Sequence, residues 1–214
     1  MEPECWHKKW DRGQIGFHEA SVHPMLERHW STLGIAAGGR VFAPLCGKSH
    51  DLLWLHQQGH EVVGVELSEI AVIDFFREHD LVSQRTAAGA LVRYQAPGYE
   101  LYCGDYFLLN AEQLGSVDAV YDRAALIALP PPMRNAYAAH LNTLTTAATR
   151  MLLITVAYDQ SQISPPPFVV EDNEVQLHYQ RDWSCAKLST AAADVKGHVA
   201  TESAFYLQRK TSHG

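Results

Sequence analysis

Two kinds of hydrophobic pattern alternate along this chain. In one, apolar residues follow each other in short runs, as in buried strands; in the other they recur at helical intervals, as in amphipathic helices. The stretch Arg40–Glu66 shows both in succession: an apolar run at residues 41–43, a turn with Gly47, a helical pattern at residues 49–58 and a second apolar run at residues 61–66. It predicts a strand, a glycine turn, a helix and a parallel strand that is covered on both faces.

The same alternation continues toward the C-terminus. We predict further helices at residues 68–79, with Ser68 as the cap, and at residues 133–146, after a run of prolines. We predict further strands at residues 91–95, 99–106, 117–121, 151–157, 185–191 and 200–208, of which the last two close the sheet as an antiparallel pair. Strands that alternate with helices favour a mostly parallel sheet with helices on both faces. No internal repeat or interdomain linker is visible, so we expect residues 1–214 to form a single domain.

The first strand–turn–helix–strand unit predicts a nucleotide-like ligand. Glu66 follows Gly47 by about 20 residues, a spacing at which a carboxylate accepts hydrogen bonds from ribose hydroxyls. A phosphate-binding P-loop requires a glycine where this chain has Phe42, and a dinucleotide fingerprint requires three glycines where this turn has one. A nucleoside without phosphates, such as S-adenosylmethionine, therefore suits the unit better. An ordinary strand–turn–helix that binds nothing is the alternative.

Composition and charge narrow the class of protein. The chain has 214 residues, of which 47% are hydrophobic, enough for one sizeable core. Its formal net charge is −7 and its basic residues are scattered, which argues against a nucleic-acid partner. We find no apolar run long enough for a membrane span and no secretory signal. The four cysteines lie far apart, which argues against a disulfide framework or a zinc cluster and favours a cytoplasmic protein.

Four motifs, in this order, resemble thiopurine S-methyltransferases. They occupy Trp6–His18, Pro44–Leu55, Gly59–Ala71 and Tyr121–Pro130, and the second reads PLCGKSHDLLWL. The resemblance, closest to bacterial members, implies an α/β protein with the class I S-adenosylmethionine-dependent methyltransferase fold. That fold has a seven-stranded, mostly parallel sheet with helices on both faces and one antiparallel strand near the C-terminal edge.

The resemblance also implies roles for individual residues. Contacts with the cofactor, S-adenosylmethionine or its product S-adenosylhomocysteine, are implied for Trp10, Leu45, Glu66, Asp105, Tyr106 and Arg123. An acceptor pocket is implied for Phe17, Arg123, Pro166 and Phe168, with Arg123 as the catalytic cation and residues 1–30 as a segment that covers the active site. Mammalian-type members have a second arginine before the final strand, for which Lys196 or His198 is the candidate substitute here.

The function implied is methyl transfer to a thiol or thiolate, such as a thiopurine-like aromatic thiol, or to a selenium or tellurium species. Such a reaction by in-line displacement needs mainly positioning, and a cation such as Arg123 favours the thiolate. We expect a small-molecule acceptor, a monomer and no metal site. A methyltransferase for oxygen or nitrogen acceptors, which usually needs a general base, and a catalytically idle nucleoside-binding protein are the alternatives.

Several of these residues also have simpler interpretations. Trp10, four residues after Trp6, fits the apolar face of a helix. Arg123 fits a structural ion pair with Asp122 or Asp105, and Asp105 itself fits a turn. For His18, beside Phe17, we expect a packing role.

Overall fold

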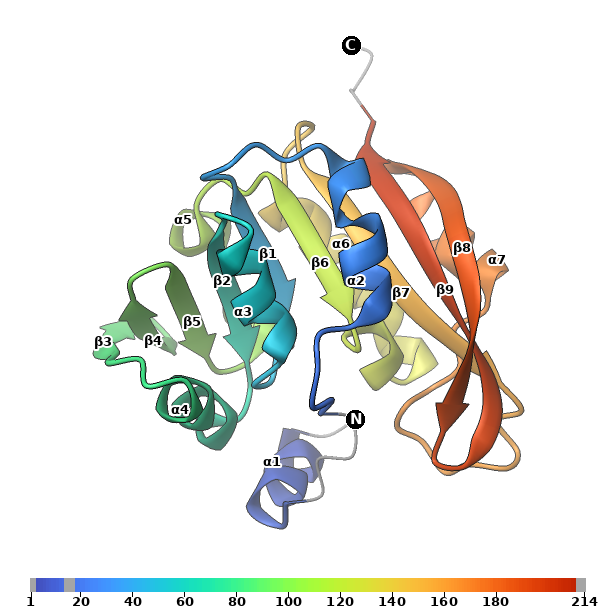
Figure 1. The fold of residues 1–214 in the computed structure, drawn as a ribbon, viewed down its shortest axis with the longest axis horizontal. Coiled ribbons are helices and arrows are strands. Elements are labelled where there is room, and N and C mark those ends of the chain that lie inside the picture. The colour runs from blue at the N-terminus through green and yellow to red at the C-terminus, as the bar shows by residue number, and fades with distance from the viewer. Residues whose placement is uncertain (1–2, 14–17, 211–214) are drawn as a thin grey trace.

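The computed structural model describes residues 3–13 and 18–210, and within these ranges nine strands form one sheet in the order β3-β4-β5-β2-β1-β6-β7-β9-β8 (Figure 1). The strands are β1 (Arg40–Pro44), β2 (Glu61–Glu66), β3 (Gln84–Ala88), β4 (Leu91–Ala96), β5 (Tyr99–Cys103), β6 (Ala119–Arg123), β7 (Arg150–Tyr158), β8 (Trp183–Val195) and β9 (His198–Arg209). The α-helices are α1 (Pro3–Asp11), α2 (Pro24–His29), α3 (His50–Gln57), α4 (Glu69–Glu78), α5 (Ala111–Leu114), α6 (Pro131–Leu144) and α7 (Asp172–Tyr179). Short 3-10 helices are η1 (Trp30–Leu33), η2 (Tyr106–Leu108) and η3 (Leu126–Ala128).

Helices cover both faces of the sheet, as predicted. One core cluster joins the sheet to α2, α3 and α4 through side chains such as Leu26, Leu55 and Phe75. The other joins it to α5, α6 and α7 through side chains such as Leu141 and Val175. Figure 1 shows α2 and α3 in front of the sheet and α6 behind it. The buried central strands are therefore apolar on both sides, which explains the continuous apolar runs of the sequence.

The predicted mostly parallel sheet is confirmed, but the implied count of seven strands is wrong. The strands β5-β2-β1-β6-β7-β9-β8 form the expected sheet, and β9 is the expected antiparallel strand near the C-terminal edge. The hairpin of β3 and β4 extends the sheet beyond β5. Strand β4 was predicted and β3 was not, because β3 pairs only with β4 and its residues are half-buried or exposed. An edge strand of that kind carries no apolar alternation.

The ends of several elements differ from the predicted ends, because the hydrophobic pattern is weak there. The strand expected at residues 99–106 ends at Cys103, because Gly104 adopts a φ of 141° and Asp105 is the N-cap of η2. Strand β8 extends from two residues before to four residues after the predicted 185–191, and β9 from two residues before to one residue after 200–208, since many of their outer residues are exposed. Helix α6 begins at Pro131, two residues earlier than predicted, because proline is tolerated in the first turn.

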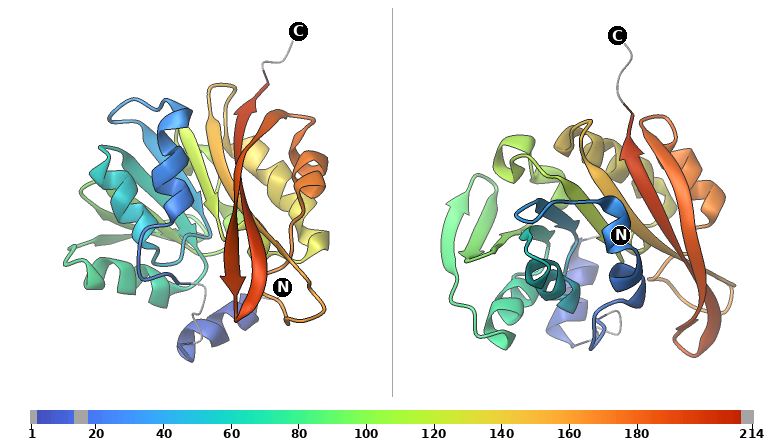
Figure 2. Two further views of the ribbon diagram at one scale, coloured as in Figure 1. Left: turned by 45° about the vertical axis from the view of Figure 1, so that its right-hand side comes forward. Right: turned by 45° about the horizontal axis from the view of Figure 1, so that its top comes forward.

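The strand order reverses at β1, which pairs in parallel with β2 on one side and with β6 on the other. In open parallel sheets a ligand binds at such a reversal, beyond the carboxyl ends of the strands. The arrows of β1, β2 and β6 point to the lower side of Figure 1, where α1 and the tip of the β8–β9 hairpin also lie. In the right-hand view of Figure 2, α1 and the tip of the β8–β9 hairpin again lie at the lower side of the sheet.

Candidate active site

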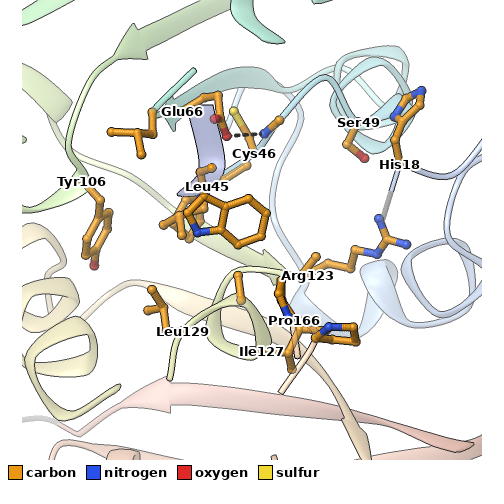
Figure 3. Close-up of a pocket in the computed structure, with 18 of the residues that line it drawn as sticks. His18, Leu45, Cys46, Ser49, Glu66, Tyr106, Arg123, Ile127, Leu129 and Pro166 are labelled. Carbon is orange, nitrogen blue, oxygen red and sulfur yellow. Dashed lines mark hydrogen bonds between the residues drawn. The ribbon is translucent and has the colours of Figure 1, made fainter. Parts of the chain in front are cut away.

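A cavity of about 340 Å³ lies at the carboxyl ends of the parallel strands. The segments that follow β1, β2, β5 and β6 form most of its wall, and α1 and the β8–β9 hairpin complete the rim. Figure 3 shows Tyr106 and Leu129 on one side of the cavity, His18 and Arg123 on the other, and Glu66 between them at the top. The sequence placed its main candidate residues at this edge, and the structure brings most of them together.

Three non-glycine residues of the cavity wall have a left-handed backbone. Leu45 follows β1 directly with a φ of 48°, Ala124 follows β6 with a φ of 65°, and Lys196 lies at the hairpin tip with a φ of 53°. Such a conformation costs about 1–3 kcal/mol for a residue with a side chain and is concentrated at ligand sites. The strain therefore marks the same edge of the sheet as the cavity does.

Glu66 ends β2 and is buried in the cavity wall. Its Oε2 accepts a hydrogen bond from the Gly47 N–H at 2.9 Å, and its Oε1 accepts one from the Ser68 N–H at 2.8 Å. Burial raises the pKa of Glu66, and the N–H groups of Ser68 and Gly47 oppose this rise. Because each carboxylate oxygen has a second lone pair, Glu66 can still accept from two ligand hydroxyls. The predicted cap Ser68 accepts no capping bond through its side chain.

Trp10 and the turn after β1 lie against each other. A Cβ atom added to Gly47 would lie 3.5 Å from the indole Cζ2 of Trp10, so the ring covers the turn closely. Trp10 is buried, and both it and Trp6 belong to α1 and line the cavity. The helix-face interpretation of this pair describes α1 correctly, but the face is turned toward the cavity.

Asp105 and Tyr106 form the wall beyond β5. Asp105 Oδ1 accepts from the Phe107 N–H at 3.0 Å and caps η2, which confirms the turn interpretation. Its Oδ2 accepts no hydrogen bond from the part of the chain that the structure describes. Tyr106 is buried, donates its hydroxyl to the Tyr137 carbonyl at 3.2 Å, and has a raised pKa because of burial. This end of the cavity is lined by aromatic rings and by the carboxylate of Asp105.

Arg123 ends β6 on the opposite side of the cavity. Its Nη2 lies 3.4 Å from Glu19 Oε1, and the Arg123 side chain is 13% exposed whereas that of Glu19 is 58% exposed. The alternative partner Asp122 instead accepts from the Tyr137 hydroxyl at 2.7 Å and the Leu126 N–H at 3.2 Å, and burial raises its pKa to about 6. Among the described residues Asp122 therefore does not hold Arg123, and an ion pair with a largely exposed partner such as Glu19 contributes little to stability.

The remaining acceptor-side candidates separate into two groups. Pro166 lines the cavity, and its carbonyl accepts from Lys196 Nζ at 2.8 Å. Phe168 lies outside the cavity wall, with its ring centre 5.9 Å from the guanidinium carbon of Arg134. His198 hydrogen-bonds Gln162 at 3.0 Å and does not line the cavity either. Phe17 lies outside the described residues.

Lys196 and His18 both line the cavity and both also contact other residues of the protein. Lys196 Nζ also donates to the Ser164 carbonyl at 3.1 Å, so it ties the hairpin tip to the proline loop. His18 stacks on His50 with ring centres 5.4 Å apart, and burial and the nearby charge of Lys48 lower its pKa. The packing role expected for His18 therefore coexists with a place on the cavity wall.

Sequence reasoning missed several polar residues of the cavity wall, and three of them are Asp51, Tyr121 and Glu202. Asp51 and Tyr121 are buried, and the Tyr121 hydroxyl donates to Asp51 Oδ2 at 2.8 Å. Glu202, on β9, is the third. The one signal for Glu202 was an acid shortly before the apolar run of residues 204–207. Among the described residues, no His, Cys, Asp and Glu side chains are grouped to hold a metal ion, and no helix is long and apolar enough to cross a membrane.

Comparison with known proteins gives a consistent family. The family model "Thiopurine S-methyltransferase (TPMT)" matches residues 1–211. A thiopurine S-methyltransferase of Pseudomonas fluorescens (strain Pf0-1) is 55% identical over 176 residues, covering 82% of this chain and 81% of the relative. One from Azotobacter vinelandii is 49% identical over 183 residues, covering 86% of this chain and 84% of the relative.

Solved structures with low sequence identity share the fold. A 1,6-didemethyltoxoflavin-N1-methyltransferase of Burkholderia thailandensis, solved with S-adenosylhomocysteine, matches with a TM-score of 0.68 at 13% identity over 98% of this chain and 87% of that one. Magnesium protoporphyrin IX methyltransferase of Synechocystis, also with S-adenosylhomocysteine, matches with a TM-score of 0.65 at 15% identity over 98% and 100%.

Proposed function

The chain belongs to the thiopurine S-methyltransferase family, and we propose that it methylates the sulfur of a small thiol or thiolate. It is an S-adenosylmethionine-dependent methyltransferase by family and by fold. The observation that carries the proposal is one cavity that is lined by Asp105 after β5, by Glu66 at the end of β2 and by the cation Arg123 at the end of β6. Thiopurine-like aromatic thiols are the acceptors we favour, with selenium and tellurium species as further candidates.

Each part of the cofactor can be assigned to cavity residues that follow or end a different strand. We assign Glu66 to the ribose hydroxyls, because both of its oxygens keep a lone pair after accepting from backbone. We assign the uncommitted Oδ2 of Asp105 to the adenine amine, with the Tyr106 ring beside the base. Leu45, at the strained turn, is assigned to the methionine end, and Trp10 covers that turn.

Catalysis requires little beyond positioning. S-adenosylmethionine supplies, when bound, a methyl group that is already activated by a positively charged sulfur. Arg123 favours the ionised form of an acceptor thiol, because a nearby positive charge lowers the pKa of an acid. Ile127 and Pro166, which lie beside Arg123 in Figure 3, exclude water and orient the acceptor for in-line attack. We assign Arg123 to both the cofactor and the acceptor, since it lies where the two meet.

A ligand and product assay tests the proposed function. We expect S-adenosylmethionine and S-adenosylhomocysteine to raise the melting temperature, and NAD and ATP to leave it unchanged, because only a ligand of the folded state stabilises it. With thiophenol as acceptor, mass spectrometry should detect methyl phenyl sulfide. Stabilisation without any methylated thiol would favour an idle nucleoside-binding protein. Methylation of phenol or aniline in place of thiophenol would favour an oxygen or nitrogen acceptor.

We further propose that residues 1–214 form a single, monomeric, cytoplasmic domain in which residues 1–30 cover the active site. Five described residues of this segment line the cavity: Trp6, Lys9, Trp10, His18 and Glu19. A segment that lies across the carboxyl ends of the sheet excludes water from the reacting groups once a ligand is bound.

Hydrogen exchange tests this covering segment. S-adenosylhomocysteine should slow amide exchange in residues 6–13, and Trp10→Ala should remove most of that protection because the indole covers Gly47. Lys8→Ala is the matched control, since Lys8 lies on the same helix, is exposed and does not line the cavity. Equal protection in Trp10→Ala and the wild type would show that the segment is ordinary core.

A further inference from the structure

One carboxylate of the cavity wall has no part in the scheme above. Glu202 lies on β9 opposite Val156 of β7, and its side chain is 28% exposed. Across the sheet, Arg123 of β6 is in register with Ile154 of β7, which is in register with Ala204 of β9. Glu202 lies two residues from Ala204 and therefore on the same face, toward the carboxyl end of β7.

The strand order then places Glu202 beyond Arg123, away from the cofactor end. Asp105 follows β5, Glu66 ends β2, Leu45 follows β1 and Arg123 ends β6, and these four strands are neighbours in that order. Strand β9 comes two places after β6, separated from it by β7. A substituent that extends from a sulfur at Arg123 away from the cofactor end would therefore approach Glu202.

Glu202 is held in place by His23, which is buried at the start of α2. The Met25 N–H donates to His23 Nδ1 at 3.2 Å, so Nδ1 is the acceptor nitrogen of the ring. The proton must then lie on Nε2, which donates to Glu202 at 3.2 Å. The backbone N–H of His23 donates in turn to Asp51 Oδ1 at 2.8 Å, which holds the backbone that carries the imidazole.

The surrounding charges keep Glu202 ionised. Burial alone would raise the pKa of Glu202, but the hydrogen bond from His23 and the positive charge of Arg123 lower it overall. Tyr121 also faces it, whereas the neighbouring residue on β8 is the uncharged Ala191. His23 uses its one ring proton toward Glu202, which lines the cavity, and the carboxylate keeps further lone pairs that can accept from a ligand.

We propose that Glu202 is a specificity-determining residue that selects acceptors with a positive or hydrogen-donating group beside the sulfur. The inference rests on the proposed function, because it places the acceptor sulfur at Arg123. An ammonium or N–H group would donate to the carboxylate in a charge-assisted hydrogen bond, whereas an anionic group there would be repelled. The enzyme then favours aminothiols and N–H-bearing thiols over thiol acids.

Three thiols that share one ring test this selection. They are 2-(aminomethyl)thiophenol with an ammonium group, thiophenol with no polar substituent, and 2-mercaptobenzoate with a carboxylate. We expect the wild type to have the highest kcat/KM for the first and the lowest for the last. Glu202→Gln should lower the ratio of these two values at least about tenfold, because attraction and repulsion are lost together. Its affinity for S-adenosylhomocysteine should be unchanged.

Two further variants separate the interpretations. His23→Asn keeps a helix-capping side chain but loses the Nε2 donor, so it should lower the same ratio by a smaller factor if His23 positions Glu202. Glu112→Gln removes an equal charge from an exposed site on α5 and should leave the ratio unchanged. A ratio in Glu202→Gln within twofold of the wild type would overturn the inference. Failure of the wild type to methylate thiophenol would instead overturn the proposed function.

Discussion

Glu66→Ala is expected to weaken S-adenosylmethionine binding at least about tenfold while the protein stays folded. The variant loses the acceptor for both ribose hydroxyls, and one hydrogen bond to a charged group contributes about 1.5–3 kcal/mol, against about 1.4 kcal/mol for each tenfold change in affinity. It also leaves the Gly47 and Ser68 N–H groups without their carboxylate acceptor, which loosens the turn. The loss of the ribose hydrogen bonds and the loosening of the turn both weaken binding of the same part of the cofactor.

Titration calorimetry below the melting temperature of the variant measures this effect. Glu61→Ala is the matched control, because Glu61 is the exposed first residue of the same strand. A modest fall in the melting temperature of Glu66→Ala is consistent with the prediction, since two buried N–H groups lose their acceptor. Wild-type affinity in this variant would show that Glu66 does not bind the ribose.

Arg123→Ala is expected to lose turnover most strongly at low pH. An opposite charge nearby lowers the pKa of an acid by about 1–3 units, so without Arg123 the thiolate fraction falls by about ten to a thousandfold below the pKa of the thiol. As the pH rises above that pKa, the thiol ionises without help and part of the activity returns. Arg123→Lys should recover less than its charge suggests, because a planar guanidinium is replaced by a point charge.

The pH profile of kcat for a weakly acidic thiol measures this effect, and Arg77→Ala, on the exposed side of α4, is the control for loss of a surface arginine. The melting temperature of Arg123→Ala should change little, because its ion-pair partner Glu19 is largely exposed. An equal loss of turnover at every pH together with a lower melting temperature would support a structural ion pair.

The hydrophobic pattern predicts those elements that are buried on both sides. Strands β1, β2, β6 and β7 were found in this way, because each is apolar over most of its length. Strand β3 and the outer parts of β8 and β9 were missed, since their exposed residues are under no requirement to be apolar. Helix α5, with four residues, is too short for its periodicity to be recognised.

The candidate site divides in the same way. Glu66 was predicted because its acid and the glycine turn have a recognisable spacing in one short stretch. The left-handed backbone at Leu45 and Ala124 has no signal in the sequence, because neither residue is a glycine. The pairing of His23 with Glu202 joins residues 179 positions apart, and local patterns contain no information on such a contact. Similarly, only the folded hairpin distinguishes Lys196, on the cavity wall, from His198.

The order of the strands along the cavity also separates the residues assigned to the cofactor from most of those on the acceptor side along the sequence. The residues assigned to the nucleoside precede β6 in the chain, whereas Pro166, Lys196 and Glu202 of the other end follow it. The hairpin tip is a two-residue turn of Lys196 and Gly197, both with positive φ, at the rim. Insertions at exposed tips are tolerated by the rest of a fold. The enzyme encoded by a duplicated gene can therefore acquire a new acceptor through changes in its last third, while the residues assigned to the methyl donor stay unchanged.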